Sequence, residues 1–120
     1  MTLHDDTVAL RQMRDHVAEA IELAADQSRD YLDTDRVFAL ALTKLVEIVG
    51  EAAARVSEEL KESHGEIPWR QIIGTRNRLI HGYDAVDYDI LWGIVDRELP
   101  DLLKGLDSTI EAMRSQPGPS

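Results

Sequence analysis

The sequence contains no cysteine and no long apolar run, and each absence excludes a class of protein. Without cysteine there is no disulfide, no thiolate metal ligand and no cysteine nucleophile. No apolar stretch approaches the roughly 20 residues that span a bilayer, and the first ten residues lack the charge pattern of a secretory signal. We therefore expect a cytoplasmic protein with one helical domain over residues 1–115 and a disordered tail, QPGPS, over residues 116–120.

Basic residues are also scarce, with 13 Lys and Arg against 23 Asp and Glu and a net charge of -10. This balance argues against a protein that coats nucleic acid without specificity, because such binding depends on neutralising phosphates. Residues 66–83 are the exception, since they contain three arginines and one glutamate and carry a net charge of +2. A local basic patch on an acidic body can hold a phosphate, but only in that region.

Helical periodicity dominates the rest of the chain, with apolar residues recurring every three or four positions. The pattern predicts four helices, over residues 6–29, 34–63 and 68–82 and from residue 87 onward. Asp33, Thr34 and Asp35 have suitable side chains to cap the second helix, and Asp87 has one to cap the fourth. Pro100 predicts a kink or break near residues 97–100. We expect an all-α, up-down four-helix bundle, and the long apolar stripe of the second helix favours a homodimer.

The third predicted helix ends in the segment Arg76–Tyr83, which has the form R-N-x-x-x-H-x-Y. Cleaving RNA without a metal needs a group that moves protons and a cation that holds the phosphate. His81 can act as general acid or base near neutral pH, and Arg76 offers a planar, permanently charged fork to phosphate. Asn77 is four residues before His81, one helical turn below it on the same face, and could orient its ring. Arg78 is a second candidate for a phosphate contact.

The spacing within this segment leaves one geometric question open. In a straight helix, Arg76 and His81 would differ by about 140° in direction and about 7.5 Å in height. Three arrangements could bring them together: the helix ends early and His81 turns back, the long Arg76 side chain wraps round, or two protomers each contribute residues.

The same residues resemble the HEPN ribonucleases, which share an Arg with a polar neighbour and a His four to six intervening residues later. The HepT-like toxins among them add a Tyr two residues after the His. The resemblance is strongest over residues 67–103 and extends more weakly, as helix order and length, over residues 8–113. It covers Arg76, Asn77, His81 and Tyr83 without departure.

The resemblance implies a metal-independent endoribonuclease that leaves a 2',3'-cyclic phosphate and needs no cofactor. Such a protein is the toxin of a type II-like toxin-antitoxin pair, and its HEPN domains pair so that both motifs face one cleft. The resemblance also implies that a partner nucleotidyltransferase antitoxin of the MntA type transfers AMP to Tyr83. Its substrate would be RNA, and we expect no membrane or DNA partner.

The same residues also allow less specific interpretations. The motif residues could form only a docking surface for a nucleotidyltransferase, on a helical module without catalysis, or an unrelated bundle could carry the motif by chance. Arg70 and Arg78 could be ion-paired surface residues, and Glu47 and Glu51 could orient Arg76 if they face it. The histidines outside the motif are scattered, so we expect no metal site.

Overall fold

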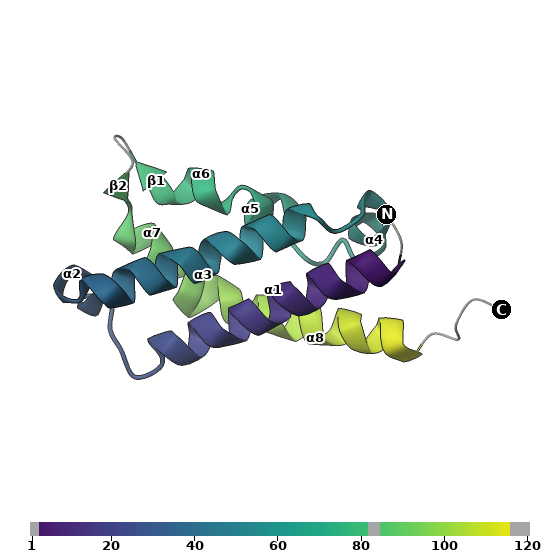
Figure 1. Ribbon diagram of the computed structural model, residues 1–120, viewed down its shortest axis with the longest axis horizontal. Helices are drawn as coiled ribbons and strands as arrows, with labels where there is room; N and C mark the ends of the chain where they lie inside the picture. The colour runs from purple at the N-terminus through teal and green to yellow at the C-terminus, as the bar shows by residue number, and fades with distance from the viewer. Residues whose placement is uncertain (1–2, 82–84, 116–120) are drawn as a thin grey trace.

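The computed structural model describes residues 3–81 and 85–115, with side chains for residues 5–80 and 85–115. Within these ranges the chain is mostly helical (Figure 1), which confirms the all-α prediction in its coarse form. The exception is a short antiparallel ladder between β1 (Ile80–His81) and β2 (Ala85–Val86). The predicted tail, residues 116–120, lies outside the described residues.

The first helical pair is formed by α1 (Leu3–Ala24) and α3 (Arg36–Ala54), which run side by side in opposite directions (Figure 1). The short helix α2 (Tyr31–Thr34) stands between them in the chain. Of the three candidate caps, Asp35 is the one that caps α3, because its side chain accepts a hydrogen bond from the backbone N–H of Phe38 at 2.8 Å. A carboxylate at this position satisfies one of the unpaired N–H groups of the first turn.

The single helix predicted over residues 34–63 is wrong, since α3 ends at Ala54 and a separate helix, α4, covers Glu58–Ser63. Ser57 begins α4 by accepting a hydrogen bond from Leu60 N–H with its hydroxyl. The buried Asp6 of α1 accepts from both Ser57 N (2.8 Å) and Ser57 Oγ (2.6 Å). This contact between distant segments stabilises the break between α3 and α4, which the apolar periodicity alone does not reveal.

The third predicted helix, residues 68–82, is also wrong in its continuity and its end. It is divided at Gly74 into α5 (Trp69–Ile73) and α6 (Thr75–Leu79), and the backbone becomes extended at Ile80. Pro68, the first residue of the predicted helix, instead stands immediately before α5 with non-helical angles (φ -79°, ψ 70°). Gly82, the predicted stop, lies outside the described residues.

The fourth helical segment is continuous but not regular. It consists of α7 (Tyr88–Gly93), the π-helix η1 (Ile94–Glu98) and α8 (Leu99–Ser115). The distortion predicted near residues 97–100 is therefore present as a π turn, in which Leu99 N–H bonds the carbonyl of Ile94. The cause is Pro100, which has no N–H to give to the carbonyl four residues earlier and whose ring crowds it.

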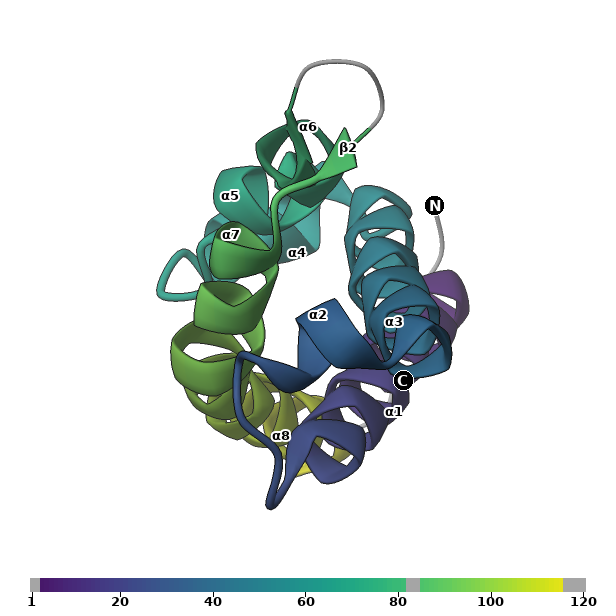
Figure 2. The ribbon, with the colours of Figure 1, turned by 90° about the vertical axis from the view of Figure 1, so that its left-hand side faces the viewer.

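An apolar core lies between these segments, and the end-on view of Figure 2 shows α1, α3, α8 and the α5–α7 region arranged around it. α1 packs against both α3 and α8, while α3 packs against α5 and α6. Fully buried members include Leu10, Met13, Leu42, Leu79, Leu91 and Leu106. Within residues 3–81 and 85–115, every helix is too short or too polar to cross a membrane.

Candidate active site

The motif segment leaves α6 at one end of the molecule and enters the β1–β2 ladder (Figure 1). In this ladder Ile80 pairs with Val86, and His81 pairs with Ala85. The backbone of His81 is therefore described, but its side chain is not, and Tyr83 lies outside the described residues. The predicted roles of both side chains stay predictions.

The end of α6 answers part of the geometric question raised by the sequence. The helix stops at Leu79, and Ile80 adopts extended angles (φ -82°, ψ 125°). His81 is consequently not on the helix that carries Arg76, so the 140° separation of a straight helix does not apply. The expectation that Asn77 lies one helical turn below His81 is wrong for the same reason.

The backbone beyond α6 is fixed by the start of α7. Asp87 N–H donates to the carbonyl of Leu79 at 2.7 Å, and the Asp87 side chain accepts from Asp89 N (3.0 Å) and Ile90 N (3.1 Å). Asp87 thus caps α7, as predicted, and also closes the base of the ladder. These bonds join the segment after β2 to the last residue of α6 and to the first turn of α7.

The two motif arginines differ in their surroundings. Arg76 is exposed and forms no ion pair with any residue in the described ranges, and Asn77 beside it is exposed as well. Arg78 is half-buried and pairs with Glu98 through two hydrogen bonds, Nη1–Oε1 at 2.9 Å and Nη2–Oε2 at 2.6 Å. The hydrogen bonds to Glu98 raise the pKa of the Arg78 guanidinium above its ordinary value, against a smaller opposing effect of burial.

The charges around α6 therefore favour Arg76 as the phosphate-binding cation, because the charge of Arg78 is already neutralised. Arg70, on α5, is exposed and lies beside the acidic helix α4. Glu47 and Glu51 form no ion pair with Arg76, and Glu51 is exposed, so no contact supports their proposed orienting role.

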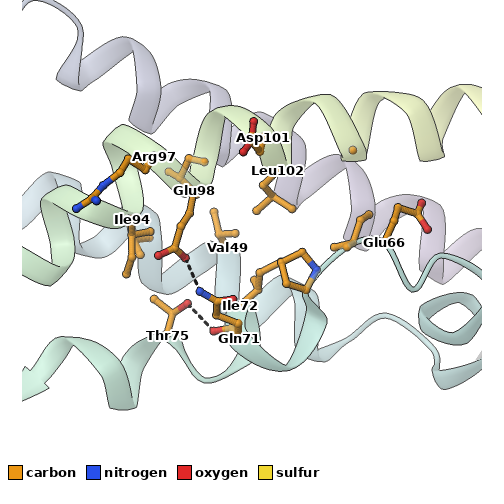
Figure 3. A pocket seen from close by; sticks show the side chains of 15 residues that line it. Val49, Glu66, Gln71, Ile72, Thr75, Ile94, Arg97, Glu98, Asp101 and Leu102 are labelled. Atoms are coloured by element: carbon orange, nitrogen blue, oxygen red, sulfur yellow. Dashed lines mark hydrogen bonds between the residues drawn. The ribbon is translucent and has the colours of Figure 1, made fainter.

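A groove of about 380 Å³ lies beside α6, with α5 on one side, η1 and α8 on the other, and α3 beneath (Figure 3). Its walls are mainly apolar, from Val49, Ile72, Ile94 and Leu102 among others. Glu98 and Gln71 meet across it, where Gln71 Nε2 donates to Glu98 Oε1 at 3.1 Å (Figure 3). The sequence did not predict a role for either residue. A regular helix drawn through Pro100 leaves the direction of the Glu98 side chain undetermined.

No group of three or more His, Asp or Glu side chains that could hold a metal occurs among the residues that the structure describes. The histidines with described side chains have local partners instead. His16 Nδ1 lies 2.7 Å from the carbonyl of Gln12, and His64 Nδ1 lies 3.4 Å from Glu66.

Comparison with known proteins places these features in a family. The family described as "Ribonuclease HepT-like" matches residues 13–108, which include Arg76, Asn77, His81 and Tyr83. The chain belongs to the HepT-like ribonuclease family. The match agrees with the resemblance carried by the R-N-x-x-x-H-x-Y segment, and it covers most of the described helices.

Three individual relatives carry ribonuclease names. The protein named "Probable ribonuclease HepT" from Thermococcus cleftensis is 38% identical over 91 residues, covering 72% of this chain and 82% of that protein. A protein of Methanocaldococcus jannaschii that carries an RNase name is 28% identical over 107 residues, covering 89% of this chain and 98% of its own. A third, from Caldanaerobacter subterraneus, also carries an RNase name and is 36% identical over 77 residues, or 64% of this chain and 69% of that protein. No solved structure matches the chain.

Proposed function

We propose that this protein is a metal-independent endoribonuclease and the toxin of a toxin-antitoxin pair, built on a HEPN-type four-helix bundle. The observation that carries the proposal is Arg76, an exposed guanidinium without an ion pair among the described residues, five positions before His81 in a HepT-like chain. On an acidic protein, an exposed arginine that forms no ion pair with the described residues is a site where a phosphate is favoured over the surrounding surface.

The proposed chemistry uses Arg76 and His81 of the motif. Arg76 binds the scissile phosphate and stabilises the extra negative charge of the phosphorane. His81 takes the proton from the ribose 2'-hydroxyl or gives one to the leaving 5'-oxygen, and water or a second group serves the other transfer. The 2'-oxygen bonds to phosphorus as the bond to the 5'-oxygen breaks, so the products are a 2',3'-cyclic phosphate and a 5'-hydroxyl.

The direct test is cleavage of RNA by the pure protein in a chelator. We expect His81→Ala and Arg76→Ala each to lower kcat/KM by about 100-fold or more, as loss of a proton-transfer group or a phosphate cation does. Arg70→Ala is the matched control, since it removes another exposed arginine from the neighbouring helix and should cleave like the parent. If the parent leaves RNA intact but still binds a nucleotidyltransferase, the non-catalytic docking module is the better function.

The protein would act as a homodimer through the outer face of α3. Val37 and Leu40 on this helix are 77% and 55% exposed, which is unusual for large apolar side chains near one another. A two-fold interface presents the same patch from both copies. Leu40→Glu should therefore convert a dimer to a monomer in light scattering, whereas Leu23→Glu, an exposed position on α1, should not.

Regulation would act on Tyr83, by transfer of AMP from ATP to its hydroxyl with release of pyrophosphate, catalysed by a partner nucleotidyltransferase. A bulky anion beside His81 and Arg76 would repel the RNA phosphate. Mass spectrometry after incubation with the partner and ATP tests this idea. Tyr83→Phe should take up no adenylate while Tyr88→Phe takes up as much as the parent, and equal labelling of Tyr83→Phe would exclude Tyr83 as the acceptor.

A further inference from the structure

Glu98 is the acidic residue that joins the motif helix to the rest of the protein. One of its carboxylate oxygens, Oε1, accepts from Arg78 Nη1 at 2.9 Å and from Gln71 Nε2 at 3.1 Å. The other, Oε2, accepts from Arg78 Nη2 at 2.6 Å. A single side chain of η1 thus holds both halves of the divided helix, α5 through Gln71 and α6 through Arg78 (Figure 3, for the Gln71 contact).

The bidentate form of the Arg78–Glu98 pair restricts rotation of α6. Two parallel N–H···O bonds fix the plane of the guanidinium as well as its position. Successive residues of a helix turn by about 100°, so Arg76 and Arg78 point about 200° apart. Holding Arg78 against η1 therefore directs Arg76 away from it, in agreement with the exposure of Arg76.

Because α6 is short, it needs a contact of this kind to fix its orientation. The helix has five residues and follows a break at Gly74, so its own backbone hydrogen bonds cannot define its orientation. The π turn of η1 contributes from the other side, because it changes the direction of Glu98 relative to a regular helix running from α7 into α8. Helical π turns often occur where a side chain must be directed to a functional site.

We propose that Glu98 is a positioning residue for RNA cleavage: by pairing with Arg78 it sets the rotation of α6, presents Arg76 to the substrate and withdraws Arg78 from it. This inference rests on the proposed ribonuclease function. It also reassigns Arg78, which the sequence suggested as a phosphate contact, to a structural partner of Glu98.

The test compares the steady-state kinetics of the parent, Glu98→Gln, Arg78→Gln and the double variant, at equal folded fraction by circular dichroism. Glu98→Gln should lower kcat by about tenfold or more, since small misplacements of a catalytic group have effects of that size. Its KM for RNA should not rise, because the released Arg78 is an added cation. The salt dependence of log KM should steepen by about 0.7 per added phosphate contact on single-stranded RNA.

The other variants separate positioning from loss of stability. Arg78→Gln should lower kcat to a similar extent without steepening the salt dependence, and the double variant should be no worse than either single change. Asp101→Asn is the matched control, since it removes an exposed acid from the same groove and should behave like the parent. If Glu98→Gln does not fold, Arg78→Gln alone decides the question by its kcat.

Each outcome distinguishes this inference from the function on which it depends. If the parent is active and kcat is unchanged in Glu98→Gln or Arg78→Gln, the positioning role alone is overturned. The same holds if the losses of kcat in the two single variants multiply in the double variant. An inactive parent, run beside His81→Ala, overturns the ribonuclease function and the positioning role with it.

Discussion

Replacing Gly50 with alanine should disturb the contact that places the motif helix on α3. A Cβ at this position would lie 3.0 Å from the carbonyl oxygen of Ile72 and 3.8 Å from Cβ of Thr75. Ordinary contact begins near 3.4 Å, so α3 and the α5–α6 segment must separate by several tenths of an ångström. The obstructing atom belongs to the backbone, and therefore no side-chain rotation can relieve the clash.

Two opposing effects set the magnitude. Alanine stabilises the middle of a helix by about 1 kcal/mol relative to glycine, whereas overpacking a close contact costs about 1–3 kcal/mol. We expect a net loss of about 1 kcal/mol in the free energy of unfolding of Gly50→Ala. Because the displaced backbone carries Thr75 and the residues after it, RNA cleavage should fall more than the loss of folded protein explains.

Gly105→Ala, in α8, provides the control. Its added Cβ would lie 3.4 Å from Cγ1 of Ile67, a side-chain atom that can move. The same helix-propensity gain should then prevail and raise stability by about 1 kcal/mol. Urea denaturation followed by circular dichroism measures both variants; a Gly50→Ala protein as stable as Gly105→Ala would refute the close-contact argument.

Two further predictions concern stability. Thr109 is 1% exposed and its hydroxyl has no hydrogen-bond partner among the described residues. Thr109→Val should therefore raise the unfolding free energy by about 1 kcal/mol. Thr75→Val should not raise it, because the hydroxyl of Thr75 donates to the Gln71 carbonyl. The hydrogen bond from Phe38 N–H is the main cause that lowers the pKa of Asp35 in the folded chain. The stability it contributes is present above the ordinary carboxyl pKa of about 3.9 and is lost as pH falls through the lower folded value. Denaturation at pH 7 and pH 3 should show a smaller loss for Asp35→Asn than for the parent, and an equal loss would contradict this assignment.

Local signals in the sequence determined the helical class, the caps and the chemistry of the motif. Asp35 and Asp87 act on N–H groups two or three residues away, so their capping roles depend on nothing distant. Pro100 likewise has a local effect, because the bond it cannot make is to the preceding turn. The R-N-x-x-x-H-x-Y segment indicated the candidate site residues independently of the fold.

Tertiary contacts decided where helices break and which of the two motif arginines is paired with Glu98. Apolar periodicity continues from α3 through α4, and the contact that stabilises the break between them joins Ser57 to Asp6, some fifty residues earlier in the chain. Arg76 and Arg78 are chemically identical in the sequence. Glu98, twenty residues beyond Arg78, neutralises one and leaves the other exposed. Electrostatic pairing depends on distance in space rather than along the chain, and for that reason only the folded structure distinguishes the two.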